Sequence, residues 1–111
     1  MWIRSQDTER LIKVTEIRCF EKLIAVNPFR ESGEFFITSI GNYGSLIANK
    51  IVVSFIEKAI EKGLKVFEMP QRFNYDIDVN YLTPDISYYY IGLDNVIYKI
   101  LDTNQKKGVF K

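Results

Sequence analysis

Acidic side chains alternate along the segment FNYDIDVNY, which spans residues 73–81. Asp76 and Asp78 stand between Asn74 and Asn80, so four oxygen-bearing side chains share one parity of the chain. Such a series of oxygen atoms can bind Ca²⁺, and a pair of carboxylates can serve as the acid and the base of a hydrolase. No other residues of the chain suggest a catalytic or metal-binding site more strongly by their types and spacing.

The calcium interpretation fails on spacing. A loop of the EF-hand type needs Gly at its sixth position for a sharp turn and Glu at its twelfth as a bidentate ligand. Counted from Asp76, those positions hold Tyr81 and Ser87. The spacing of the fourteen acidic residues nominates no carboxylate pair, so we predict no metal site and no catalytic residue.

Histidine is absent, and the single cysteine is Cys19. Histidine is the commonest general base and metal ligand, and one cysteine alone cannot complete a zinc site. Because Cys19 stands in a strand-like run, we interpret it as a small buried hydrophobic residue. We therefore predict a non-enzymatic protein that carries no cofactor.

Gly41 and Gly44 in the segment IGNYGS precede a helical pattern. Free backbone N–H groups at a helix start bind phosphate when a glycine-rich loop of suitable spacing presents them. The sequence has neither the dinucleotide-binding nor the Walker spacing here. We interpret both glycines as turn and cap residues.

Three consecutive tyrosines place aromatic rings on both faces of one expected strand, so at least one phenol ring should face water. Exposed rings stack bases in many single-strand binders, where lysines such as Lys106 and Lys107 would contact phosphates. Tyrosine-rich surfaces also form protein interfaces, and they need no charged groove. We expect a partner to bind at four residues: Tyr88, Tyr89, Tyr90 and Lys99.

The alternation in residues 73–81 also predicts a structure. Phe73, Tyr75 and the following residues of that parity are apolar or aromatic, whereas Asp76 and Asp78 belong to the polar parity. A period of two is typical of a strand with one buried and one solvated face. We therefore predict a strand over residues 73–81, with both aspartates on its solvent-exposed face.

One amphipathic helix is predicted over residues 46–62. Apolar side chains recur there at intervals of three and four residues. Ser45 is a suitable N-cap, and Gly63 can take the left-handed conformation that ends a helix. We expect the helix to bury one apolar stripe against a sheet, at about 1.5–3 kcal/mol for each large side chain. Four members of that stripe are Val52, Phe55, Ile56 and Ile60.

The other segments predict strands and turns. The start MWIRSQD should form a strand anchored by Trp2, and β-branched residues favour a longer strand in LIKVTEIRCF. Pro70 should end a strand that follows the helix. Two hairpins are expected: KLIAVN with EFFITSIG, and ISYYYIG with VIYKILD, the second turning at Asn95. Val109 and Phe110 could add a short edge.

Composition places the chain among ordinary globular proteins. Its 111 residues are 47% hydrophobic and 26% charged, which indicates a single domain over residues 1–111. The net charge of +1 gives no general attraction to nucleic acid or anionic lipid. No apolar run approaches the ~18 residues of a membrane span, and the charged start does not fit a signal peptide. We expect a cytoplasmic protein.

The segments MWIRSQD, IGNY and VFEMP, with an amphipathic helix after IGNY, resemble a group of small uncharacterised proteins from genomes and prophages of Gram-positive bacteria. Those proteins open with a WIRSQD-like strand, and the resemblance covers roughly residues 1–70. It implies no activity and no catalytic residue. The helix start LIA and residues 71–111 depart from the pattern of the group.

These patterns together predict an α+β fold, in which a mostly antiparallel sheet of about six or seven strands packs against one helix. A small, partly closed barrel is the alternative architecture. For function we predict an accessory protein of a mobile element that binds a protein partner, or its own copy, through a sheet edge or the tyrosine-bearing face. The alternative is a single-stranded nucleic-acid binder, and a carboxylate-dependent hydrolase ranks third.

Overall fold

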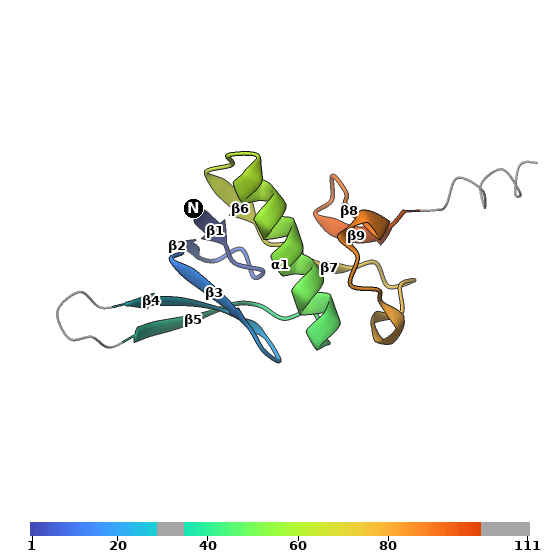
Figure 1. Ribbon diagram of the computed structural model, residues 1–111, viewed down its shortest axis with the longest axis horizontal. Coiled ribbons are helices and arrows are strands. Elements are labelled where there is room, and N and C mark those ends of the chain that lie inside the picture. Colours follow the sequence, from blue (N-terminus) through green and yellow to red (C-terminus); the bar gives the residue numbers. More distant parts are fainter. Residues whose placement is uncertain (29–34, 101–111) are drawn as a thin grey trace, which may run out of the picture.

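The computed structural model describes residues 1–28 and 35–100 (Figure 1). Across these residues the chain forms one α-helix, nine strands and two short 3₁₀ helices. In chain order they are β1 (Trp2–Arg4), β2 (Leu11–Lys13), β3 (Glu16–Cys19), β4 (Leu23–Pro28), β5 (Phe35–Gly41), α1 (Leu46–Glu61), β6 (Val66–Glu68), β7 (Arg72–Phe73), η1 (Val79–Tyr81), η2 (Ile86–Tyr88), β8 (Tyr89–Ile91) and β9 (Val96–Lys99).

The α+β class is confirmed, and the strands are divided among three small sheets. Their orders are β2-β1-β6, β3-β4-β5 and β7-β9-β8. β1 pairs with β6, and β7 with β9, in parallel, while the other pairs are antiparallel. Nine described strands in three sheets thus take the place of six or seven strands in one. Both predicted hairpins are confirmed, as β4 with β5 and as β8 with β9.

The predicted long strand in LIKVTEIRCF is broken into β2 and β3. The side chain of Asn27 on β4 accepts a hydrogen bond from the N–H of Thr15 at 2.9 Å and donates one to the carbonyl of Lys13 at 2.7 Å. These bonds replace ladder partners at the break, so the chain leaves one sheet and enters the next without losing backbone hydrogen bonds.

The N-terminal strand is anchored by a different residue from the one predicted. Ile3 is completely buried, whereas Trp2 keeps 42% of its surface exposed. Successive side chains of a strand point to opposite faces, so only one of the two neighbours can enter the core. The expectation that Trp2 anchors β1 is therefore wrong.

The helix agrees closely with its prediction. α1 spans Leu46–Glu61, and the hydroxyl of its N-cap Ser45 accepts a hydrogen bond from the N–H of Ala48 at 3.1 Å. Gly63 has a φ of 75°, which favours glycine because that residue has no Cβ. In the part of the chain that the structure describes, no helix combines the length and the hydrophobicity that crossing a bilayer requires.

The buried face of α1 is narrower than predicted. Val52 and Ile56 are buried, and Phe55 packs partly against the core, but Ile60 is 57% exposed. Ile60 follows the buried Ala59, so it lies about 100° further around the helix, outside the covered face. The prediction that Ile60 is a core residue is wrong.

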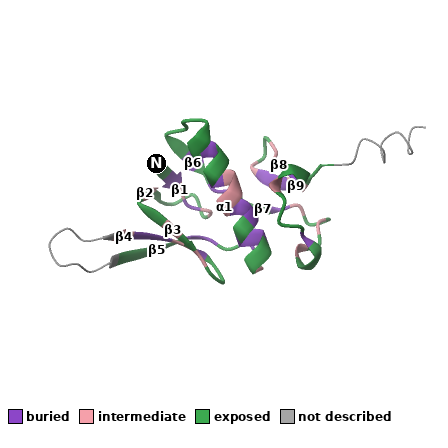
Figure 2. Cartoon of the chain, in the orientation of Figure 1, coloured by how far each residue is buried: buried purple, intermediate pink, exposed green. Residues whose placement is uncertain are grey.

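All three sheets contribute to the same hydrophobic core around α1 (Figures 1 and 2). In the view of Figure 1, β7, β8 and β9 lie to the right of the helix, and the other two sheets lie to its left. The cluster includes Ile3 from β1, Leu23 from β4, Phe67 from β6 and Ile97 from β9. Burial of these large side chains, at roughly 1.5–3 kcal/mol each, joins three small sheets into one body.

The strand predicted over residues 73–81 is wrong beyond Phe73. β7 ends at that residue, and the chain then turns and forms the 3₁₀ helix η1. Tyr75 and Tyr81, which the alternation placed inside, are 84% and 82% exposed.

Local hydrogen bonds explain why the alternation misleads. The N–H of Ile77 donates to the carbonyl of Asn74 at 2.9 Å, and a carboxylate oxygen of Asp78 accepts from the N–H of Asn80 at 2.9 Å. Asn and Asp side chains offer the backbone partners two or three residues away, and these compete with a sheet ladder. A backbone turn at Asn74 and the side-chain cap of Asp78 therefore take the place of a continued strand.

Distant segments meet beside Pro70. The side-chain amide of Gln6 donates to the carbonyl of Gln71 at 2.7 Å, and its oxygen accepts from the N–H of Asn42 at 2.7 Å. The hydroxyl of Tyr43 donates to the carbonyl of Pro70 at 2.6 Å. Burial raises the pKa of Tyr43, so this phenol keeps the proton that it donates. We call these residues the Pro70 junction.

A buried asparagine connects the helix to this junction. Asn49 on α1 is completely buried, and its side-chain oxygen accepts from the N–H of Tyr43 at 2.9 Å. Its amide nitrogen donates to the carbonyls of Phe20 and Glu21, at 3.2 and 3.0 Å. One buried side chain thus provides hydrogen-bond partners for three backbone groups from two turns.

Replacing this side chain tests its structural role. We expect Asn49→Ala to lower the free energy of unfolding by about 3 kcal/mol, because three backbone groups lose their partners where little water can replace them. The adjacent exposed variant Lys50→Ala should change it by no more than about 0.5 kcal/mol. Urea unfolding followed by far-ultraviolet circular dichroism measures both values. Equal stability of the two variants would contradict the assigned role of Asn49.

Candidate functional site

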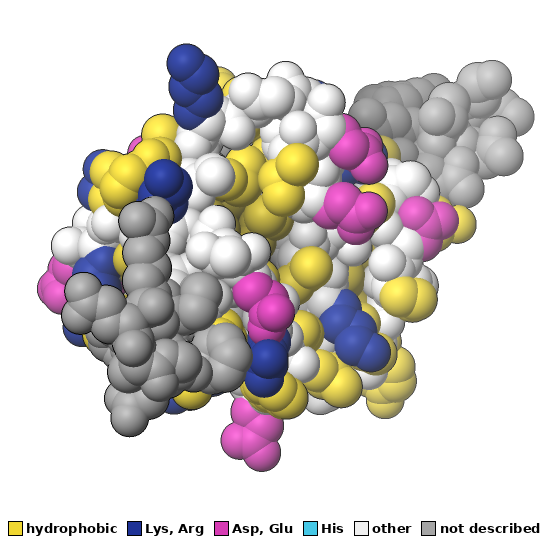
Figure 3. Space-filling model, turned by 60° about the vertical axis from the view of Figure 1, so that its left-hand side comes forward, with side chains coloured by type: hydrophobic (Ala, Val, Ile, Leu, Met, Phe, Trp, Pro, Cys, Tyr) yellow, Lys and Arg dark blue, Asp and Glu magenta, His cyan; other side chains and the backbone are white. Residues whose placement is uncertain are grey.

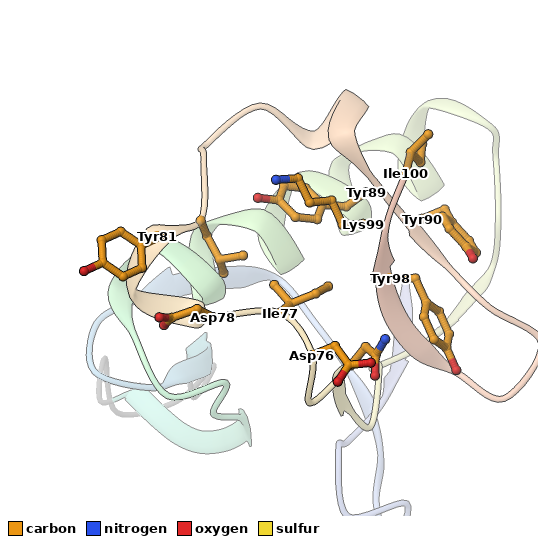
Figure 4. A pocket seen from close by; sticks show the side chains of 11 residues that line it. Asp76, Ile77, Asp78, Tyr81, Tyr89, Tyr90, Tyr98, Lys99 and Ile100 are labelled. Carbon is orange, nitrogen blue, oxygen red and sulfur yellow. The ribbon is translucent and has the colours of Figure 1, made fainter. Parts of the chain in front are cut away.

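An open groove of about 810 Å³ lies between the segment after β7 and the β8–β9 hairpin (Figure 4). The buried residues Leu82 and Tyr89 are among its lining. We call it the tyrosine groove, and define it by six of its polar and aromatic members: Asp76, Asp78, Tyr81, Tyr90, Tyr98 and Lys99.

The four predicted partner-binding residues have different positions. Tyr90 and Lys99 line the groove, and Tyr90 is about half exposed. Tyr89 also reaches the groove, but only 4% of it is exposed, and its hydroxyl accepts from the N–H of Thr83 at 3.0 Å. Tyr88 belongs to η2, outside the groove, and is half exposed. Lys99 pairs with Tyr89 across the β8–β9 hairpin.

Two tyrosines form one wall of the groove. The rings of Tyr90 and Tyr98 stack with their centroids 5.5 Å apart and their planes at 22°. The hydroxyl of Tyr98 donates to a carboxylate oxygen of Asp94, which lowers the pKa of Asp94 and raises the pKa of Tyr98. A Cβ on Gly92 would lie only 2.9 Å from the ring of Tyr98, so this glycine permits the close approach. The wall is therefore oriented before any partner binds.

The two aspartates come from the segment after β7, with Asp76 nearer to Tyr98 and Asp78 farther along the groove beside Tyr81 (Figure 4). Asp78 caps η1, and Tyr81 projects beside it with 82% of its surface exposed. In the described ranges, the one ion pair joins Arg18 to Glu16, so neither Asp76 nor Asp78 is paired with a cation. Residues 1–28 and 35–100, which the structure describes, contain no group of three or more acidic, cysteine or histidine side chains that could bind a metal ion.

Sequence reasoning recognised some members of this groove but not their assembly. It placed Asp76 and Asp78 on the solvent-exposed face of a strand and Tyr81 on the buried face, and it assigned no role to Tyr98. The clustering of Asn and Asp in residues 74–80 is the signal that could have indicated a turn. No local signal brings that turn beside the β8–β9 hairpin, because their contact depends on the parallel pairing of β7 with β9.

Of the predicted structural roles, that of Gly44 as a turn residue is confirmed, whereas Gly41 is the last residue of β5 and Cys19 is only partly buried. Cys19 is half-buried against the core, and burial raises the pKa of its thiol in spite of the nearby Lys50. A raised pKa keeps the sulfur protonated and therefore a poor nucleophile. Gly44, with a φ of 92°, turns the chain just before the helix cap, and Gly41 lies in close contact with the Pro70 junction.

The groove has the chemistry of a binding surface. Exposed tyrosine faces attract cations through their ring quadrupole, and carboxylates without cation partners do so by charge. Lys99 adds one donor that can pair with an acceptor of a bound chain. No family model, no curated protein and no solved structure matches this chain, so the groove itself is the basis for inferring function.

The hydrogen bond that fixes Tyr98 can be tested by pH. We expect Tyr98→Phe to raise the pKa of Asp94 toward its ordinary value of 3.8, because the largest cause of its lowering is removed. A carboxyl with a lowered pKa stabilises the fold above its ordinary pKa, and this contribution is lost as the pH falls through the lowered value. The stability difference between wild type and variant should therefore shrink below about pH 4.

Carboxyl carbon shifts followed by NMR between pH 2 and 7 give the pKa of Asp94 directly, with Tyr90→Phe as the control. That control keeps an aromatic ring and leaves the donor to Asp94 in place. An unchanged pKa in Tyr98→Phe would show that the hydrogen bond does not persist in solution.

Proposed function

We propose that this protein is a non-enzymatic interaction protein that binds an extended segment of a partner protein in the tyrosine groove. The observation that carries the proposal is a groove that brings together Asp76 and Asp78, without cation partners in the described chain, and the stacked rings of Tyr90 and Tyr98. Surface tyrosines supply large contact areas at low cost in side-chain entropy, which is why interfaces are enriched in them.

The chemistry of the groove favours a partner segment that carries lysine or arginine. A cationic side chain of the segment would lie over the exposed ring of Tyr90, on the side of the groove where Asp76 is the nearer carboxylate, and Asp78 beside Tyr81 would attract a second cation toward the other end (Figure 4). Tyr81 would cover the bound segment at the other end, since most of its ring is exposed. We infer a partner with at least one basic residue next to an apolar or aromatic one.

Nucleic acid fits the groove less well. Asp76 and Asp78 would repel phosphate groups, and among the described residues that line the groove Lys99 is the one cation that would attract them. Tyr89 is buried and cannot stack on a base. Lys106 and Lys107, which that alternative would use, lie outside the described residues.

We further propose that the chain is related to the group of Gram-positive bacterial and prophage proteins that it resembles, and that it acts in the cytoplasm. The segments that carry the resemblance supply Gln6, Asn42, Tyr43 and Pro70, which meet in one junction. Residues that must fit together in space restrict one another, which supports treating the shared segments as one structural signature.

Titration with a set of peptides tests the proposed function. Extended twelve-residue peptides that vary in lysine, arginine and aromatic content would be titrated against the full chain by fluorescence anisotropy. We expect the peptides with both basic and aromatic residues to bind. The double variant Asp76→Asn with Asp78→Asn should bind these peptides about tenfold more weakly, because the two charges at the rim contribute up to about 0.7 kcal/mol each.

The matched control is Glu57→Gln with Glu61→Gln, which removes the same charge from exposed positions of α1. It should leave peptide binding nearly unchanged. Equal loss in both double variants would indicate a general charge effect, and no binding by any peptide would contradict the proposal. The nucleic-acid alternative is tested by titrating single-stranded oligonucleotides at two salt concentrations. Binding that depends on salt would favour that alternative.

A further inference from the structure

The parallel pairing of β7 with β9 stops where Phe73 pairs with Ile97. The N–H of Asn74 then donates to the carbonyl of Ile97 at 2.7 Å. In a longer parallel ladder, the carbonyl of Asn74 would next accept from the N–H of Lys99. It accepts instead from the N–H of Ile77 at 2.9 Å, so the turn after β7 removes the ladder partner of Lys99.

The main chain of Lys99 points away from β8. The next residue, Ile100, donates its N–H to the carbonyl of Tyr88 at 2.7 Å, on the β8 side of β9. Successive residues of a strand direct their N–H and C=O groups to opposite edges. Both groups of Lys99 therefore point to the edge where β7 has ended, and no strand of the described chain pairs with them there. We call this position the open edge of β9.

The tyrosine groove runs along the open edge of β9. Tyr98 and Lys99 both line the groove, although consecutive side chains of a strand point to opposite faces of a sheet. Figure 4 shows Tyr89 and Lys99 on one side of β9, and Tyr90 and Tyr98 on the other. A cavity that reaches both faces of a strand must follow its edge. A segment bound in the groove therefore lies in the plane of the sheet.

We propose that the partner segment adds to the sheet as a short strand at the open edge of β9. The N–H of Lys99 donates to the main chain of this segment, and the carbonyl of Lys99 accepts from it. Extended segments bind other sheet edges in this way, with main-chain hydrogen bonds for affinity and alternate side chains for specificity. The inference rests on the proposed function and adds the way in which the segment is held.

The charge of the groove supports a basic segment at this edge. Acidic and basic side chains are interspersed on the side of the molecule that Figure 3 turns forward, so charge selects no partner there. Among the described residues that line the groove, the carboxylates of Asp76 and Asp78 outnumber the one cation, Lys99. A lysine or arginine of the bound strand is therefore attracted to this site.

The two faces of the edge favour different side chains. On the face of Tyr98, Asp76 is the nearer carboxylate, so a basic side chain fits there (Figure 4). On the other face the groove is lined by the buried Tyr89 and Leu82, and Tyr89 is held by the N–H of Thr83 at 3.0 Å. Because a strand points consecutive side chains to opposite faces, the partner should alternate basic and apolar residues.

Hydrogen exchange of the full chain tests the main-chain contact. The probe is an acetylated twelve-residue peptide in which lysine alternates with valine, a residue that favours extended structure. Saturation with this peptide should slow exchange of the Lys99 amide at least about tenfold, because its N–H gains a partner. The Ile100 amide, which already donates to Tyr88, should change much less. An unchanged Lys99 amide in the saturated complex would overturn the inference.

Two variants of one residue separate the main chain from the side chain. Lys99→Pro removes the N–H, whereas Lys99→Ala removes the same charge and keeps the N–H. Proline is tolerated at a strand position whose N–H has no ladder partner, so circular dichroism should show both variants folded. Lys99→Pro should bind the probe about tenfold more weakly than Lys99→Ala. Equal affinities would contradict strand addition.

Methylation of the peptide distinguishes the inference from the proposed function. One probe carries methyl groups on the main-chain nitrogens of its lysines, and a second carries them on those of its valines. Only one of these two sets faces β9, so the affinities should differ at least about tenfold. Tight binding of both probes would overturn strand addition and leave the proposed function intact. Failure of every peptide to bind, methylated or not, would overturn both.

Discussion

The structure depends on covering the buried face of α1. A helix of sixteen residues is marginal by itself in water, and a three-stranded sheet with strands this short is no more stable alone. Ile51, Val52 and Ile56 are buried because all three sheets deliver apolar side chains to the same cluster. The fold is therefore cooperative by necessity, since loss of one sheet would expose the helix face that the others need.

Polar groups inside this body hold its turns in register. Asn49 binds three backbone groups, and the Pro70 junction joins the turn after β1 to the start of the helix. Asn95 extends the connection by donating to the carbonyl of Met69 at 2.9 Å, which ties the β8–β9 turn to the same place. The three sheets are thus fixed to one another by hydrogen bonds as well as by the core.

The tyrosine groove follows from the short length of β7. This strand ends after two residues, and the turn that follows carries Asp76 and Asp78 into the groove that the stacked tyrosines also line. The interrupted strand therefore leaves aromatic and charged groups available for a partner.

The sequence alone determined the helix, its caps and both hairpins, because those depend on contacts within a few residues. Ser45, Gly63 and Asn95 each signal their position through their own side chain or backbone freedom. The tertiary structure decided that Trp2 faces outward and that residues 74–81 turn. Strand alternation shows which residues share a face but not which face is buried, and the polar residues that alternate in a strand also cap turns. The parallel pairing of β7 with β9, between residues far apart in the chain, brought this turn beside the β8–β9 hairpin and so built the groove.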